Sequence, residues 1–409
     1  MGSEGATEGI AEGTAWQPPT AVEQGLHAAG LRGDRQAFFS VLAATDLFFP
    51  VPRELADAAP HRLHLSPFRD PQVDGLCLPA FTRGMLPPPT TEQVFERGDL
   101  AALAKAWPRS VRWLALNPGT PLETFLPAEP KRWRRYARNA PAESRLKTLW
   151  TGDRHGPLAH GMACGALLLV NNGSIWNHLG WQNGGYTEEK ELLAAWWGVR
   201  GRADWLAIQE RLLNGDVIPP AWEFVLRVRQ AMMKEHGAVP GAVQWRETAE
   251  RVLLSRTAEL VDQTGRPPDF DLDADIELVQ DLIGRILRYE ARFRADGLLD
   301  ADAAVRSVLA WDFGRASCMA RWGLGARYCD LAETEWAVLR AGAGARRVYR
   351  SWPDFAAGYI LGRCLHFDGE EFGEWYAEMV TAFRILATDP ESPWLSVPWE
   401  QPAADLTEL

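Results

Sequence analysis

Two short stretches in the second half of the chain place charged side chains where the pattern otherwise predicts a protein core. AWDFGRASCMARWG carries Asp312 and Arg315 three residues apart, and SWPDFAAGYILGRCLHF carries Tyr359 and Arg363 four apart. Each stretch is apolar on most of a helical circumference, so each predicts a buried helix that contains an arginine. Two guanidinium groups that face one cavity could clamp the phosphate or carboxylate of a ligand. Alternatively, each arginine is paired in the core, because an isolated buried charge is very costly, and Asp312 and Asp354 are the expected partners.

The residues around these charges predict how the two helices pack. Gly358 and Gly362 lie four apart and give the second helix a smooth face that another helix can approach closely. Trp311 and Trp352 are placed to cover the arginines by stacking on their guanidinium planes. Together with Gly314, these residues form the structural motif that we expect to hold the helices together.

Other pairs of reactive side chains lack the surroundings that catalysis or metal binding requires. His160 and Cys164 lie four apart in LAHGMACGALLLV, but a nucleophilic thiolate must be stabilised and exposed, and this pair opens an apolar helix. Cys364 and His366 lie two apart, on different faces of a helix, which is a poor geometry for a metal. We therefore expect packed thiols at these positions and no catalytic residue.

Alternating aspartates in DFDLDADIELVQD look like the start of a calcium-binding loop. Such a loop needs a glycine at its sixth position and a carboxylate at its twelfth, and the chain has Ala274 and Gln280 there. Asp273 is instead expected to cap a helix that begins near Ile276. The sequence also contains no glycine-rich phosphate loop, nucleophile elbow or zinc signature, so it predicts neither a metal nor a cofactor.

Composition argues against two classes of partner. The 409 residues carry 43 basic and 54 acidic side chains, a formal net charge of −11. This negative charge disfavours general binding to nucleic acids or anionic membranes. No apolar run reaches the ~20 residues that span a bilayer, the N-terminus has no secretion-signal pattern, and the cysteines are scattered as in reduced proteins. A cytoplasmic location is therefore expected.

One segment departs from this charge balance. PKRWRRYARN interleaves cations with Trp133 and Tyr136, and cations with stacking aromatics could bind a nucleic acid. We prefer the interpretation that a solvated helix here balances acidic protein surface, because the chain as a whole is negative. The cations are Lys131, Arg132, Arg134, Arg135 and Arg138.

The order of the patterns predicts two domains of different fold class. Short apolar runs bounded by Pro, Gly, Asp and Asn alternate with helical patterns over residues 25–128, which indicates an α+β domain. There, TTEQVFERGDLAALAKAW is expected to be one helix. Residues 159–399 show helical periodicity only, about ten helices of an all-α domain. Residues 1–24 and 400–409 are expected to be tails, and residues 129–158 a basic linker.

Two segments resemble known protein families. W-D-x-G-R in AWDFGRA, followed by S-W-x-x-F and G-Y-x-x-G-R in SWPDFAAGYILGR, resembles the bacterial domain-of-unknown-function family 1266 over about residues 160–399. This resemblance implies an α-helical domain without established chemistry. LPAFTRGMLPPP and VRWLALNPGTPLETFL resemble the N-terminal domain of SseB, the enhanced serine sensitivity protein, over about residues 25–127. The matching positions are Phe81-Thr82 and Asn117-Pro118-Gly119, whereas Arg83 stands where a small polar residue is common.

These features predict a bacterial accessory protein that acts through protein–protein interaction and catalyses nothing. The resemblance to SseB implies an accessory role, in some cases near a secretion or toxin system. The alternative is a small-anion-binding protein, or an enzyme, that uses Arg315 and Arg363, with Asp312 and Tyr359 beside them, as a binding site in a pocket of the helical domain. A structural cluster should have carboxylates that match its arginines, whereas a ligand site should show surplus positive charge facing a pocket.

Overall fold

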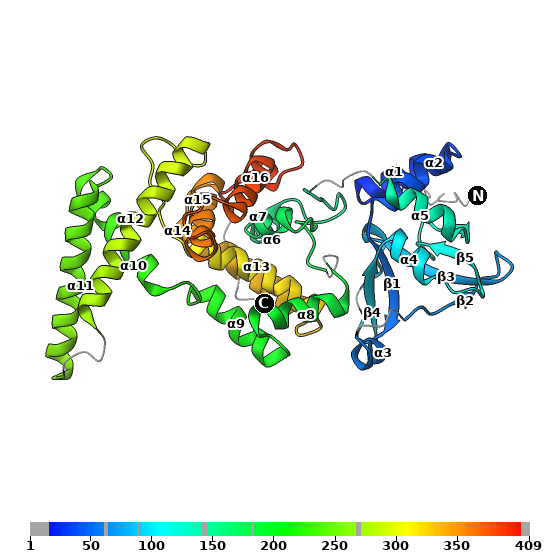
Figure 1. The fold of residues 1–409 in the computed structure, drawn as a ribbon, viewed down its shortest axis with the longest axis horizontal. Helices are drawn as coiled ribbons and strands as arrows, with labels where there is room; N and C mark the ends of the chain where they lie inside the picture. Colours follow the sequence, from blue (N-terminus) through cyan, green and yellow to red (C-terminus); the bar gives the residue numbers. More distant parts are fainter. Residues whose placement is uncertain are drawn as a thin grey trace, which may run out of the picture. The chain divides into compact units, whose positions relative to one another are not determined.

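The N-terminal region combines a mixed β-sheet with helices, whereas the described residues from 186 onward form helices only, as the sequence predicted (Figure 1). The computed structural model describes residues 16–60, 64–88, 90–140, 145–180, 184–266 and 271–401.

Two compact units make up the chain, and both are discontinuous in sequence. The first draws its described residues from 16–47, 67–86 and 99–140, and the second draws them from 48–66, 87–98 and 145–401. Two short N-terminal segments thus fold with the helical part of the chain. The predicted domain boundaries, with a linker at 129–158, stay a prediction.

In the first unit, helices flank strands that run in both directions. β3 pairs with β5 in parallel, with Leu78 opposite Leu114, and β5 pairs with β6 antiparallel, with Leu114 opposite Leu126. Asp34 and Asp99 cap α2 and α4 by accepting hydrogen bonds from backbone N–H groups, which is why both helices begin where they do. The elements are α1 (Ala21–Leu31), α2 (Arg35–Ala43), β2 (Phe68–Arg69), β3 (Leu76–Thr82), η1 (Arg83–Met85), α4 (Leu100–Ala106), β5 (Val111–Leu116), β6 (Thr124–Pro127) and α5 (Pro130–Arg138).

The strands of the second unit correct one prediction. The stretch expected to form a single helix is a strand, β4 (Gln93–Gly98), followed by the short helix α4. Val94 and Phe95 are both buried, and the Gly98–Asp99 step separates the strand from a capped helix. β4 lies next to β1 (Leu47–Pro52) in the strand order, and α3 (Arg53–Ala58) follows β1.

Helices build the rest of the second unit. Twelve occur among the described residues of 145–401, against the ten or so that were expected. They are α6 (Gly156–Ala163), α7 (Ala166–Asn171), α8 (Tyr186–Trp197), α9 (Arg202–Asn214), α10 (Pro220–His236), α11 (Ala242–Thr264), α12 (Leu272–Asp296), α13 (Leu309–Gly325), α14 (Leu331–Val348), α15 (Trp352–Phe367), α16 (Glu374–Thr388) and α17 (Pro393–Ser396).

The start of α12 corrects a second prediction. Asp271 rather than Asp273 is the N-cap, and its carboxylate accepts hydrogen bonds from the backbone N–H groups of Asp273 and Ala274. The helix therefore begins at Leu272, one turn earlier than expected, because the earlier aspartate already satisfies the free N–H groups. Asp269 lies outside the described residues.

α13 is the central helix of the second unit. Fifteen of its seventeen residues are buried, and it packs against α14, α15 and α9. All five cysteines are buried and unpaired, which agrees with the prediction of packed thiols. None of the helices among the described residues is both long and apolar enough to cross a membrane.

Candidate functional site

Asp312 and Arg315 form a buried ion pair on α13. Nη2 of Arg315 donates to Oδ1 of Asp312, and its Nε donates to the backbone carbonyl of Trp311 at 3.2 Å. The second carboxylate oxygen of Asp312 accepts the backbone N–H groups of Val217 at 3.1 Å and Ile218 at 3.2 Å. The pair therefore anchors the connection between α9 and α10 to the central helix.

Burial and attraction act against each other on this pair. Burial raises the pKa of the Asp312 carboxyl and lowers the pKa of the Arg315 guanidinium, and the attraction between the two groups opposes both shifts. As predicted, Trp311 covers the arginine: the guanidinium carbon lies 3.5 Å from the centre of its ring, and Trp197 lies at 5.4 Å. The carboxylate, the carbonyl and the rings thus stabilise the Arg315 charge from several sides.

Arg363 has a different partner from the one expected. Its Nη2 lies 3.4 Å from Oε2 of Glu378 on α16, and its guanidinium lies 5.0 Å from the ring centre of Trp375. Asp354, the predicted partner, is bound instead to Arg306 at 2.9 Å. The prediction was wrong because Asp354 lies in the first turn of α15, whereas Arg363 lies in its last two turns, more than 12 Å away by helical rise.

Trp352 also departs from its predicted role. Its ring packs on His160 and Trp399, with 4.8 Å between ring centres in each case, and its indole N–H donates to the carbonyl of Val397 at 2.8 Å. Trp352 therefore anchors the C-terminal segment and does not cover an arginine.

The glycines of α15 do permit the close helix contact that was predicted. A Cβ atom at Gly362 would lie 2.9 Å from Cβ of Trp311, and one at Gly358 would lie 2.7 Å from the hydroxyl of Tyr349. Gly314, on the facing helix, has the backbone carbonyl of Cys164 at 2.8 Å from such a position. A side chain at Gly362 would push α15 away from α13, whereas one at Gly358 or Gly314 would clash with Tyr349 or with the Cys164 carbonyl.

Tyr359 is fully buried in this contact and its pKa is raised by burial. Its hydroxyl has no hydrogen-bond partner among the residues that the structure describes. The reactive pair His160 and Cys164 is buried as well: the thiol donates to the carbonyl of His160, and burial raises the pKa of Cys164 to about 12. Such a thiol stays protonated at neutral pH and is no nucleophile.

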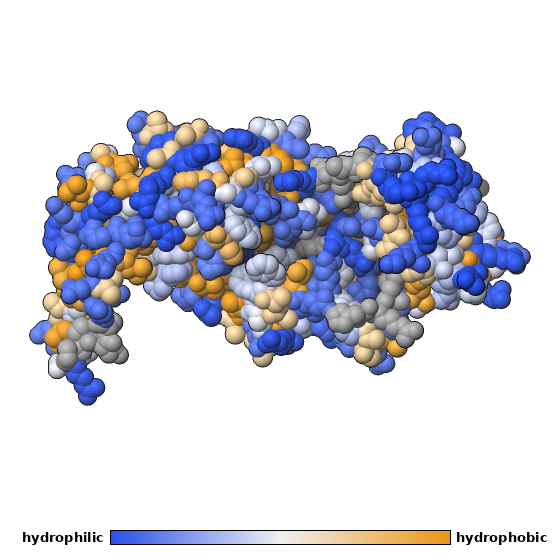
Figure 2. Space-filling model, in the orientation of Figure 1, coloured by the Kyte–Doolittle hydropathy of each residue, from blue (hydrophilic) through white to orange (hydrophobic). Residues whose placement is uncertain are grey.

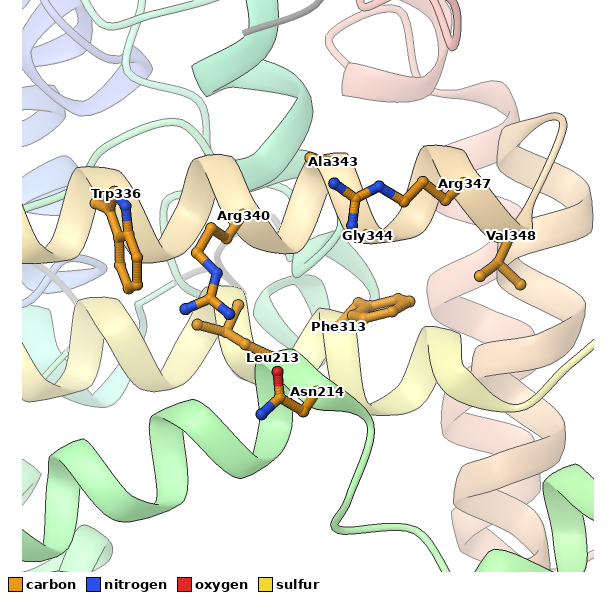
Figure 3. Close-up of a pocket in the computed structure, with 9 residues that line it drawn as sticks. All are labelled: Leu213, Asn214, Phe313, Trp336, Arg340, Ala343, Gly344, Arg347 and Val348. Carbon is orange, nitrogen blue, oxygen red and sulfur yellow. The ribbon is translucent and has the colours of Figure 1, made fainter. Parts of the chain in front are cut away.

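A pocket of about 500 Å³ lies elsewhere in the second unit, between α9, α13 and α14 (Figure 3). α14 contributes Arg340 and Arg347, Phe313 of α13 forms an apolar surface, and Asn214 lies at the end of α9. The full lining is Leu213, Asn214, Phe313, Trp336, Arg340, Ala343, Gly344, Arg347 and Val348. None of the four residues proposed from the sequence as a binding site lines it.

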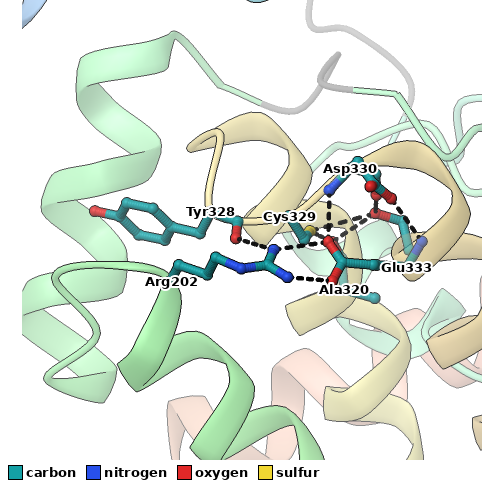
Figure 4. Close-up of polar contacts among 7 residues, drawn as sticks. Arg202, Ala320, Tyr328, Cys329, Asp330 and Glu333 are labelled. Atoms are coloured by element: carbon teal, nitrogen blue, oxygen red, sulfur yellow. Dashed lines mark hydrogen bonds and ion pairs between the residues drawn. The ribbon is translucent and has the colours of Figure 1, made fainter.

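Two ion pairs join α9 and α14, and one of them borders this pocket. Both terminal nitrogens of Arg340 bond to the carboxylate of Glu210, at 2.8 and 3.1 Å. At the start of both helices, Arg202 makes the same bidentate contact with Glu333, at 2.8 and 2.6 Å (Figure 4). Glu333 is itself held by the reciprocal cap that it forms with Asp330, so this second pair joins the first turns of the two helices.

The comparison with protein families covers this same region. The model of the family described as "Protein of unknown function (DUF1266)" matches residues 192–399, which is more than half of the chain. The chain belongs to the DUF1266 family. Searches of the curated proteins and of the solved structures find no match.

The DUF1266 segment contains the predicted cluster and the pocket alike. The match begins at residue 192, later than the start near 160 that the sequence suggested, and it does not extend to residues 25–127. The resemblance of residues 25–127 to the SseB N-terminal domain therefore stays a prediction.

Sequence reasoning missed the arginines of the DUF1266 pocket, although a signal was present. WAVLRAGAGARRV places Arg340 and Arg347 two helical turns apart with Ala343 and Gly344 between them. This spacing indicates a basic helix face whose small residues leave space between the two arginines. The opposite wall carries no such signal, because Leu213 and Phe313 are ordinary apolar residues until the fold brings them together.

Proposed function

We propose that this DUF1266 protein is a bacterial cytoplasmic accessory protein that binds another protein and catalyses no reaction of its own. Its net charge of −11 argues against nucleic acid as the partner. The resemblance of residues 25–127 to SseB supports an accessory role, in some cases near a secretion or toxin system. In the basic segment, Arg132 pairs with Glu129 at 3.2 Å and Arg134 donates to the carbonyl of Ala104, which supports a structural role for these cations.

The observation that carries the proposal is the exposed half of the α11–α12 hairpin. α11 has 23 residues, but only Trp245, Ala249 and Thr257 are buried. Leu254 and Leu260 remain 42% and 44% exposed. A helix of this length in a monomer normally buries a continuous apolar stripe, so this one leaves apolar surface available for another molecule.

α12 adds a further exposed leucine to the hairpin. Leu278 is 54% exposed, and all eight buried residues of the helix lie from Val279 onward. With a rise of about 1.5 Å per residue, Leu260 lies about 6 Å from the end of α11, and Leu278 lies about 9 Å from the start of α12. Gln280 of α12 bonds to the Arg246 carbonyl and to the Glu250 carboxylate of α11, so Leu278 lies within about 6 Å of the level of Leu254 and roughly 15 Å along the hairpin from Leu260. Figure 2 shows apolar surface interspersed with polar residues over this part of the molecule.

The alternative function, anion binding through Arg315 and Arg363, has less support. Each arginine has a carboxylate partner, Asp312 and Glu378 respectively, so the cluster carries no surplus positive charge. Both arginines are less than one-tenth exposed, which leaves little of either guanidinium for a ligand.

Site-specific photo-crosslinking in the native host tests the proposal. A photoreactive residue at position 260 or 278 is expected to trap the same protein, identified by mass spectrometry. The control position is 331, where Leu331 on α14 is also about half exposed. Leu260→Glu, combined with the probe at 278, should abolish the crosslink without unfolding the chain, because Leu260 is exposed. Recovery of the same proteins from position 331, or of none from 260 and 278, would refute the proposal.

A further inference from the structure

The arginine pocket between α9, α13 and α14 has the features of a ligand site and is separate from the α11–α12 hairpin. The wall of α14 presents Trp336, Arg340, Gly344 and Arg347 at successive turns of one helix face. The volume of about 500 Å³ falls within the range of about 300–1,000 Å³ that is usual for small-molecule pockets.

The space above Phe313 depends on a glycine. A Cβ atom at Gly344 would lie 2.8 Å from the Phe313 ring, so the missing side chain lets α14 lie directly over the ring. Figure 3 shows the Arg347 side chain turned back toward Gly344, and the Arg340 guanidinium directed toward Leu213 and Asn214. Both cations therefore border the volume that Phe313 lines from below.

The charges of this pocket do not balance. Arg340 is held by Glu210 and lies 4.4 Å from the ring centre of Trp336, so its position is fixed. Arg347 is exposed, and among the described residues no carboxylate forms an ion pair with it. Two guanidinium groups thus share one carboxylate, which leaves a surplus of one positive charge.

This surplus selects the class of ligand. A monoanion would neutralise the pocket, whereas a dianion such as a phosphate monoester would leave a negative charge beside the Glu210 carboxylate. Phe313, Val348 and Leu213 offer apolar surface for the remainder of the ligand. A cation near the C-terminus of a helix is also favoured by the helix dipole, but that effect requires neither a pocket nor an aromatic floor.

We propose that this pocket binds a small organic carboxylate with a flat apolar body, whose carboxylate bonds to Arg347 and to the free edge of Arg340 while its apolar part lies on Phe313. Arg347 supplies the planar pair of donors that suits a carboxylate, and Arg340 adds a fixed second charge.

Isothermal titration of the full chain with four carboxylates tests this assignment: benzoate, naphthalene-2-carboxylate, indole-3-acetate and octanoate. At least one of the flat acids is expected to bind, at least about tenfold more tightly than its uncharged alcohol analogue, because a charge-assisted hydrogen bond is lost in the alcohol. Arg347→Gln should weaken binding about tenfold or more. Arg350→Gln, which removes an exposed arginine just outside the pocket, should leave binding unchanged.

A second variant separates the pocket from general surface charge. Ala343→Phe should fill the partly exposed space beside Gly344 and abolish binding while circular dichroism stays that of the parent chain. The assignment fails if none of the four acids binds, if acid and alcohol bind equally, if naphthyl phosphate binds more tightly than naphthalene-2-carboxylate, or if Arg347→Gln binds like the parent. None of these outcomes bears on crosslinking at positions 260 and 278, so the two proposals fail independently.

Discussion

Arg315 and Arg347 belong to consecutive helices of one unit, but their surroundings differ in kind. Arg315 is covered by Trp311 and bonded to Asp312, and its environment is complete within the chain. Arg347 is exposed at the edge of a pocket, and no described carboxylate pairs with it. A buried arginine needs a partner within the protein, because an unpaired buried charge is very costly. An exposed arginine beside an apolar pocket surface can instead bind a ligand from solution.

The comparison extends to other pairs of the same unit. Arg229 is fully buried, bonds to both oxygens of Glu290 at 3.0 and 2.7 Å, and donates to the carbonyl of Val305. The exposed pair of Arg340 and Glu210 has the same bidentate geometry but remains open to water. The geometry of an ion pair therefore does not show whether the pair stabilises the fold or leaves its arginine able to bind a ligand. The solvent exposure of the pair distinguishes the two cases.

The largest effect is expected from Glu290→Ala. It leaves the Arg229 charge stranded in the core and removes the acceptor of the Val305 backbone N–H, so the unfolding free energy should fall by about 3–5 kcal/mol. Chemical denaturation measures this loss. Glu210→Ala is the matched control, since it removes the partner of Arg340 at the surface and should cost at most about 1 kcal/mol. Equal losses in both variants would erase the distinction between buried and exposed pairs.

Arg315→Ala should have the next largest effect, about 3 kcal/mol, because Asp312 would lose its charged partner while it stays buried. Arg315→Lys should also destabilise the chain, since lysine cannot bond to the carboxylate and the Trp311 carbonyl with one planar group. Arg363→Ala should cost only about 1 kcal/mol, because its partner Glu378 is partly exposed. A melting temperature of Arg315→Ala that equals or exceeds that of the parent would favour the ligand-site alternative.

A third prediction concerns acid. His160 is fully buried, and burial lowers its pKa from 6.5 to about 3. Between these two values the unfolded chain binds a proton that the folded chain does not, so stability falls as the pH drops below 6.5. The slope contributed by this residue is about 1.4 kcal/mol per pH unit. Above pH 6.5 His160 is neutral in both the folded and the unfolded chain, so it no longer makes the stability depend on pH.

Denaturation of His160→Leu between pH 7 and pH 4.5 measures this contribution. The variant should show a shallower loss of stability than the parent, whatever its absolute stability at pH 7. His236→Leu, which changes an exposed histidine on α10, should keep the slope of the parent. Parallel curves for the parent and His160→Leu would show that this histidine does not titrate on unfolding.

The part of the interior cluster that lies within one helix could be predicted from the sequence, and the part that spans helices could not. Asp312 and Arg315 are three residues apart, so helical geometry alone brings them together. Arg363 and Glu378 lie on different helices, and the choice of Glu378 over Asp354 depends on how α16 packs. The glycine face of α15 was predictable because close approach needs no particular partner.

Competition between neighbouring sequence patterns explains the errors in the predicted fold. QVFERG is short and precedes a strong helical pattern, so its two buried apolar residues were assigned to the predicted helix and not to a strand. The inclusion of β4 with the helical unit has no signal in the sequence, because it depends on contacts such as those between Glu96 and Thr187. Those partners are 91 residues apart.

The smallest effect on stability is expected from Arg347→Ala, which removes the exposed arginine at the edge of the pocket. The variant should change the unfolding free energy by no more than about 1 kcal/mol, which is the size of a helix-dipole contribution in the last turn of α14. A larger difference in stability between the variant and the parent should appear only when a ligand is present. At ten times the dissociation constant, a bound carboxylate should stabilise the parent chain by on the order of 1 kcal/mol, because it binds the folded state alone. Thermal unfolding with the flat acid that binds most tightly should therefore raise the midpoint of the parent and of Arg350→Ala but not of Arg347→Ala. If Arg347→Ala instead lost as much stability as Arg315→Ala without any ligand, the two arginines would have the same structural role, and the distinction between them would be wrong.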